Sequence, residues 1–204
     1  TGGNIETNGD DPVVAYTLTL ESTAASIRLT DDVMTEGDVT MLAHDEIRLR
    51  NVTVSNQGNV SLTARHGVVD TTDELSAASE DGGFLDFILE TRRVPESIVR
   101  AVEGSVSITS ETDAVRVYDV IAGQAVNLWA SDTITVTGLV EGKASSAEQS
   151  AIRLESHASG VIMDGGKLFA PFGKISVLAE DEVRQQAIGG LIGYEWIEGR
   201  GFRA

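Results

Sequence analysis

Short apolar–polar–apolar stretches return along this chain at steps of 20 to 26 residues. They begin at Leu18, Val39, Val60, Leu85, Val106, Val126, Ile152 and Ile175. A period near 22 residues is too short for a repeated domain, and it is typical of architectures in which each unit packs only on its neighbours. The period therefore predicts a stack of about eight similar units.

Each unit has the residue pattern of short β-strands joined by turns. A small residue follows four positions after seven of the eight starts, at Ser22, Ala43, Ala64, Ser110, Ala130, Ser156 and Ala179, whereas Leu89 breaks the rule. Further alternating stretches follow near residues 27, 47, 115, 134 and 161, and a glycine often precedes the next start. Period-two alternation predicts strands that bury one face, and the chain has no helical stretches that would link strands in a βαβ sheet. A two-sheet sandwich would not require a constant period, so we predict an all-β fold of the parallel β-solenoid type.

The repeat also sets the expected domain organisation. We assign residues 14–183 to the solenoid, with a polar lead-in at 1–13. The segment 184–204 leaves the repeat and is expected to cap the last coil or to join it to whatever follows. The acidic segment 71–84 and the small, polar segment 141–150 are expected to be loop excursions.

The amino-acid composition excludes several classes of binding partner and environment. Asp and Glu number 32 against 15 Lys and Arg, for a formal charge of −17, which argues against binding to nucleic acid. Aromatic residues make up only 5%, as a narrow solenoid interior requires. There is no cysteine, and no apolar run is long enough for a transmembrane segment.

Several coils carry a recognisable motif, seen in residues 58–64 (GNVSLTA), 37–43 (GDVTMLA), 104–110 (GSVSITS) and 173–179 (GKISVLA). The motif resembles the repeats of filamentous-haemagglutinin-type proteins, over roughly residues 14–183. This resemblance implies a right-handed parallel β-helix from a large bacterial surface or secreted protein, often an adhesin. An extracellular or cell-surface location is the corresponding expectation.

The three histidines are the first candidates for chemistry. His44, His66 and His157 lie five or six residues after their coil starts. If the register holds, His44 and His66 lie near each other at one edge of adjacent coils, where a pair of imidazoles could bind a transition metal weakly. The alternative is that all three are exposed turn residues without a ligand.

Acidic pairs are the second candidates. Calcium prefers clustered carboxylate oxygens in turns, and Asp73, Glu74, Glu80 and Asp81 are the residues that could supply them. No calcium-binding nonapeptide or EF-hand motif accompanies them, so solvated turn charge is the alternative. Calcium is therefore left open as a cofactor, and a calcium-stiffened surface module is the corresponding function.

We interpret the chain as a non-enzymatic structural or adhesive segment of an extracellular bacterial protein or filament, which self-assembles end to end. Its expected partners are neighbouring copies or repeats, surface glycans or a host receptor. The alternative is a carbohydrate-active β-helix, either a polysaccharide lyase or hydrolase or a glycan binder. Against catalysis, Asp31 and Asp32 have no evident basic or histidine partner in the next coil, and Trp129 and Trp196 lie far apart in sequence.

Overall fold

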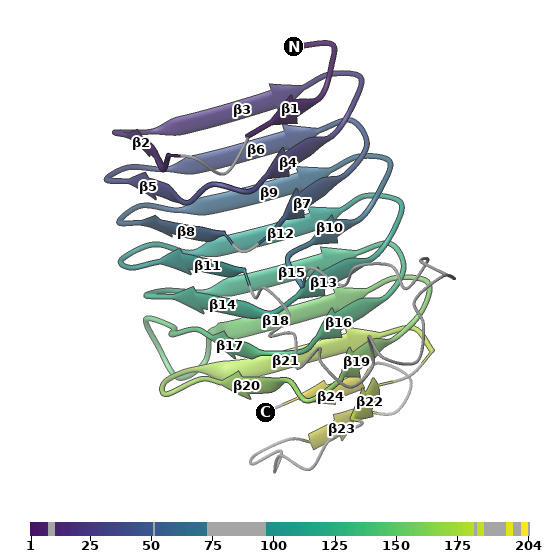
Figure 1. Cartoon of the computed structure of the whole chain (residues 1–204). Helices are drawn as coiled ribbons and strands as arrows, with labels where there is room; N and C mark the ends of the chain where they lie inside the picture. Colours follow the sequence, from purple (N-terminus) through teal and green to yellow (C-terminus); the bar gives the residue numbers. More distant parts are fainter. Residues whose placement is uncertain are drawn as a thin grey trace, which may run out of the picture.

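The chain winds into a right-handed parallel β-helix (Figure 1). The computed structural model describes residues 1–7, 11–50, 52–72, 97–181, 183–185, 195–197 and 201–203. These residues form strands, turns and connections but no helix. The fold class predicted from the 22-residue period is confirmed.

Three sheets form the walls of the solenoid, and we call them sheets A, B and C. Sheet A has the order β1 (Ile5–Glu6), β4 (Ile27–Leu29), β7 (Ile47–Leu49), β10 (Val69–Asp70), β13 (Val115–Val117), β16 (Ile134–Val136), β19 (Val161–Met163) and β22 (Val183–Gln185). Sheet B has the order β2 (Val13–Ala15), β5 (Val33–Thr35), β8 (Thr53–Asn56), β11 (Ile98–Ala101), β14 (Asp119–Ala122), β17 (Leu139–Glu141) and β20 (Lys167–Phe169). Sheet C has the order β3 (Leu18–Ser22), β6 (Val39–Ala43), β9 (Val60–Ala64), β12 (Val106–Ser110), β15 (Val126–Ala130), β18 (Ser150–Ser156), β21 (Lys174–Ala179), β24 (Gly201–Arg203) and β23 (Glu195–Ile197).

The core consists of columns of equivalent side chains that run along the axis. One column in sheet C contains, in register, Leu20, Met41, Leu62, Ile108, Leu128, Leu154 and Val177. Its five central members, from Met41 to Leu154, are at most 1% exposed. Burying a side chain of this size contributes about 1.5–3 kcal/mol. Alternation within each strand therefore becomes a continuous hydrophobic interior.

The small residues at the fourth position after each start face the corner between sheets C and A. Ala43, Ala64 and Ala130 are fully buried there. The serines at this position use their hydroxyls: Ser110 Oγ donates to the Gly67 carbonyl at 2.7 Å, and Ser156 Oγ donates to the Asp132 carbonyl at 2.6 Å. Only a small side chain fits this corner, and a serine there satisfies a carbonyl of the preceding coil's turn.

Glycines that precede coil starts allow neighbouring turns to approach closely. A Cβ on Gly104 would lie 2.2 Å from the Gly58 carbonyl oxygen, one coil away. No side chain is tolerated at that distance from backbone, which explains why a glycine precedes these coils.

The register corrects one predicted coil. Val106 of β12 pairs directly with Val60 of β9, so sheet C has no level for a strand that starts at Leu85. Residues 73–96, which include this predicted coil, lie between β10 and β11 in the sequence and outside the described residues. The segment 141–150, predicted as an excursion, contains the connection of residues 142–149 between β17 and β18.

The stack begins earlier than the expected boundary at residue 14. Ile5 pairs with Ile27 in sheet A, and the Thr1 amino group donates to the Glu21 carbonyl at 2.8 Å. The segment assigned as a polar lead-in thus contributes a strand, because a single apolar residue, Ile5, suffices to continue the core column. At the other end, β24 pairs antiparallel with β21, so the parallel order of sheet C stops there.

Candidate functional site

The outer face of sheet C carries an aromatic pair that the repeat brings together from two coils. Trp129 on β15 and His157, just after β18, have ring centroids 5.0 Å apart and ring planes tilted by 46°. Trp129 is the register partner of Thr109 on one side and of Glu155 on the other. The indole is half-buried, and the imidazole is exposed.

A fixed carboxylate lies beside this pair. Glu155 Oε2 accepts hydrogen bonds from Arg153 Nη2 at 2.6 Å and Nε at 2.9 Å, while Glu155 Oε1 lies 2.8 Å from His157 Nε2. Burial alone would raise the pKa of Glu155, but the hydrogen bonds from Arg153 and His157 outweigh that effect and lower it. The cluster of Trp129, Arg153, Glu155 and His157, which we call the Trp129 cluster, offers an aromatic ring next to oriented polar groups.

Sequence reasoning missed the Trp129 cluster because it compared the two tryptophans only with each other. Trp196 lies in β23, and three strands separate it from β15 in sheet C. The available signal was the register: Trp129 is three residues after one coil start, and Glu155 is three residues after the next.

His44 and His66 lie together, as their coil positions predicted. Their ring centroids are 4.5 Å apart, with planes tilted by 51°. His44 Nδ1 lies 2.8 Å from Asp45 Oδ1. His157 lies apart from this pair, in the Trp129 cluster.

Asp31 and Asp32 take structural positions. Asp31 is only 6% exposed. Asp32 Oδ1 accepts a hydrogen bond from the Thr53 backbone N–H of the next coil at 2.7 Å. Asp119 accepts in the same way from Leu139 N–H at 2.7 Å. These turn carboxylates satisfy backbone donors of the following coil, which accounts for part of the acidic composition.

A charged network on the outer face of sheet A was also missed. Glu46 bridges two arginines of neighbouring strands, with Oε1 2.9 Å from Arg28 Nη2 and Oε2 2.9 Å from Arg48 Nε. Burial would raise the pKa of Glu46, but the two guanidinium groups lower it overall. Arg28 and Arg48 are register partners, so their like charges are brought side by side and the shared carboxylate offsets the repulsion.

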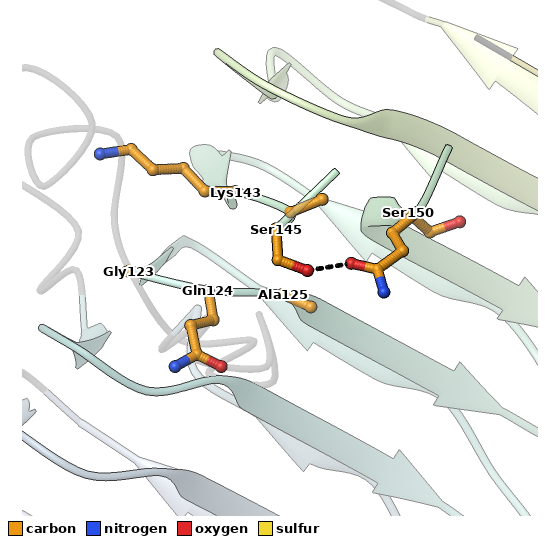
Figure 2. A pocket seen from close by; sticks show the side chains of 8 residues that line it. Gly123, Gln124, Ala125, Lys143, Ser145 and Ser150 are labelled. Carbon is orange, nitrogen blue, oxygen red and sulfur yellow. Dashed lines mark hydrogen bonds between the residues drawn. The ribbon is translucent and has the colours of Figure 1, made fainter. Parts of the chain in front are cut away.

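A surface depression lies where the β14–β15 turn meets the connection before β18 (Figure 2). It has a volume of about 630 Å³ and is lined by Gly123, Gln124, Ala125, Lys143, Ala144, Ser145, Gln149 and Ser150. Figure 2 shows Lys143 extending away from the hydrogen bond that Ser145 donates to Gln149. Its lining residues offer amides, hydroxyls and one ammonium group, which can form hydrogen bonds with a polar ligand.

The remaining predicted sites have different outcomes. The calcium candidates Asp73, Glu74, Glu80 and Asp81 lie outside the described residues. In the part of the chain that the structure describes, no three His, Cys, Asp or Glu side chains gather as a metal-binding group. The same part contains no apolar helix of membrane-spanning length.

Comparisons with protein-family models, with curated proteins and with solved structures found no match.

Proposed function

We propose that this chain is a non-enzymatic structural segment of an extracellular bacterial surface protein or filament, whose coils continue into another coil through the N-terminal end. The stacked sheets would act as a stiff rod that holds binding surfaces away from the cell. The resemblance of the coil motif to filamentous-haemagglutinin-type repeats supports the location. The observation that carries the proposal is the open edge of β3.

At this edge, among the described residues, the level that contains β1 and β2 has strands in sheets A and B and none in sheet C. β1 and β2 lie one level beyond β4 and β5. In sheet C, β3 pairs with β6 on one side. On its other side, among the described residues, Thr1 bonds to Glu21 and Thr23 and the Gly3 carbonyl accepts from Ser22 Oγ at 2.7 Å, all at the end of the strand. Among the described residues, the middle of β3 has no backbone partner on this side.

The core is uncovered at the same place. Leu18 and Leu20 are only partly buried, whereas their register partners Val39 and Met41 are 0% exposed. An extended strand with apolar residues at alternate positions would complete both the hydrogen bonds and the core, as in β-strand addition. All the remaining coil starts in sheet C have this alternating pattern. Another coil, of the same polypeptide or of a neighbouring copy, therefore fits beside β3. At the opposite end of this sheet, β24 already pairs with β21.

The test uses disulfide trapping, because the chain has no cysteine of its own. The probe is a synthetic peptide with the sequence of residues 58–64, in which cysteine replaces the serine at the position of Ser61. Beside β3, that cysteine would lie one strand spacing, about 4.8 Å, from a Thr19→Cys thiol, within disulfide range. Thr40→Cys, one strand further at about 9.6 Å, is the matched control and lies out of range.

We expect Thr19→Cys to form the mixed disulfide faster than Thr40→Cys. A peptide with its apolar and polar positions exchanged should lose the preference, since its side chains would face the wrong way. Equal rates at the two positions, or an unchanged preference with the exchanged peptide, would refute an edge that accepts another coil.

A second candidate function, glycan binding, is favoured by the Trp129 cluster. The C–H bonds of a pyranose ring carry partial positive charge and pack on the negative face of an indole. Arg153 and Glu155 supply a donor and an acceptor that hydroxyl groups can use, on an open sheet face where a long polysaccharide could lie. We place glycan contact at this cluster, with no step of bond cleavage.

A glycan array with the full chain tests this second function. Trp129→Ala should abolish the signal. Phe169→Ala is the control, because Phe169 is also an exposed aromatic, at 52%, but lies in sheet B. Absence of any saturable glycan signal, or equal loss in both variants, would remove the glycan-binding candidate.

A further inference from the structure

The pairing of consecutive coils fixes the His44–His66 contact in place. The two residues follow β6 and β9, which pair over their full length in sheet C. The pairing continues beyond the strands, since His44 N–H donates to the Ser22 carbonyl and His66 N–H donates to the His44 carbonyl, both at 2.8 Å. Because main-chain hydrogen bonds position both residues, their imidazoles are brought together without ordering a loop.

One imidazole is already oriented as a ligand. Asp45 Oδ1 lies 2.8 Å from His44 Nδ1. A carboxylate can only accept, so the proton of the neutral ring lies on Nδ1 and the lone pair lies on Nε2. This carboxylate–histidine arrangement is the one that orients histidines toward metal ions in proteins. The His44 side chain is 40% exposed and His66 is an exposed residue, so an ion can reach both rings from solvent.

The spacing of the rings matches a shared ion. With metal–nitrogen bonds of about 2.0–2.1 Å, each ring centroid lies about 3.2 Å from the metal. Two such rings on one ion have centroids about 4.5 Å apart at a square-planar angle of about 90° and about 5.2 Å apart at the tetrahedral angle. The observed separation is 4.5 Å. The two rings are therefore close enough for rotation about their side-chain bonds to turn one nitrogen of each toward a common ion.

We propose that His44 and His66 form a two-imidazole site for a divalent transition cation such as Zn²⁺, Ni²⁺ or Cu²⁺. Imidazole nitrogen suits these ions, whereas calcium prefers oxygen ligands. Asp45 acts through His44, as a positioning residue that fixes its tautomer. Water or groups from a second molecule complete the coordination, so the site is open on the surface at the corner between sheets C and A.

The third histidine provides a matched control. His157 is also exposed and also lies beside a carboxylate, with Nε2 2.8 Å from Glu155 Oε1, but its ring neighbour is Trp129. His157→Ala thus removes one exposed imidazole without touching the proposed site.

Isothermal titration of the full chain with ZnCl₂, NiCl₂ and CuCl₂, in about 0.15 M NaCl with excess CaCl₂, tests the proposal. The salt and the calcium suppress loose binding of cations to the acidic surface. We expect one transition ion per chain, loss of that binding in both His44→Ala and His66→Ala, and no change in His157→Ala. Asp45→Asn should keep the stoichiometry and weaken affinity by about 10–100-fold. Far-UV circular dichroism confirms that each variant is folded.

The proposal is overturned if the wild-type chain binds no transition ion under these conditions, or if either single histidine variant retains wild-type affinity. Equal weakening by His157→Ala would also overturn it, because the binding would then reflect exposed imidazoles in general.

Discussion

Truncating two leucines of a single core column measures how closed the solenoid is at its N-terminal end. Leu128 and Leu20 occupy the same column of sheet C, but Leu128 lies in the middle of the stack at 1% exposed, whereas Leu20 lies in β3, at the N-terminal edge of this sheet, and is half-buried. Leu128→Ala removes buried methyl groups and leaves a cavity that neighbouring coils cannot fill, so it should lower the free energy of unfolding by about 3–4 kcal/mol. Leu20→Ala leaves a gap that water already reaches, and we expect about 1–2 kcal/mol.

The assay is urea unfolding followed by far-UV circular dichroism and by tryptophan fluorescence, since Trp129 is next to Leu128. Repeat arrays can lose cooperativity, so the comparison holds only where the two probes give coincident transitions. A cost for Leu20→Ala equal to that for Leu128→Ala at low protein concentration would refute the open edge of β3. A cost for Leu20→Ala that rises with protein concentration would show that another copy covers this end. A cost below about 1 kcal/mol for Leu128→Ala would refute the continuous core column itself.

Two further predictions concern the turns and the charged surface. Gly104→Ala would force a Cβ against the Gly58 carbonyl oxygen, so the urea midpoint should fall by the equivalent of about 1–3 kcal/mol, and a midpoint like that of the wild type would contradict the close turn contact. Glu46→Gln should lower stability at neutral pH by about 0.5–1 kcal/mol, because its partners Arg28 and Arg48 are partly exposed and solvent screens them. The folded-state pKa of Glu46 lies below its ordinary value, so this contribution is present above about pH 4.3 and is lost as pH falls through the folded-state pKa. The midpoints of variant and wild type should therefore converge in acid, and a difference that persists at about pH 3 would show that the charge of Glu46 is not its cause.

The stacking of like residues followed directly from the sequence, and so did the contact between His44 and His66. In a parallel solenoid, equivalent positions in consecutive coils must lie side by side, so counting residues from each coil start predicts which side chains are neighbours. Leu85 shows where this counting fails. An isolated alternating triplet is a local pattern, and only pairing with a neighbour makes it a level of the sheet. β9 pairs with β12 instead.

The Trp129 cluster and the Glu46 network show the same limit at the level of side chains. Trp129 lies three residues after its coil start, whereas His157 lies five residues after its own, so counting residues does not pair them. Their contact arises because the indole is long enough to reach the residue that follows β18 in the next coil. Glu46 shares its carboxylate between two arginines because Arg28 and Arg48 occupy adjacent levels while Glu46 lies just before β7.

The sequence by itself determined the period, the inward-facing residues and the closeness of equivalent turn residues, because these depend only on alternation and on a constant repeat length. Only the tertiary structure decided which levels exist and where the stack is open. These features depend on backbone pairing between residues far apart in sequence, and the local pattern of a strand is the same whether or not its outer edge has a partner.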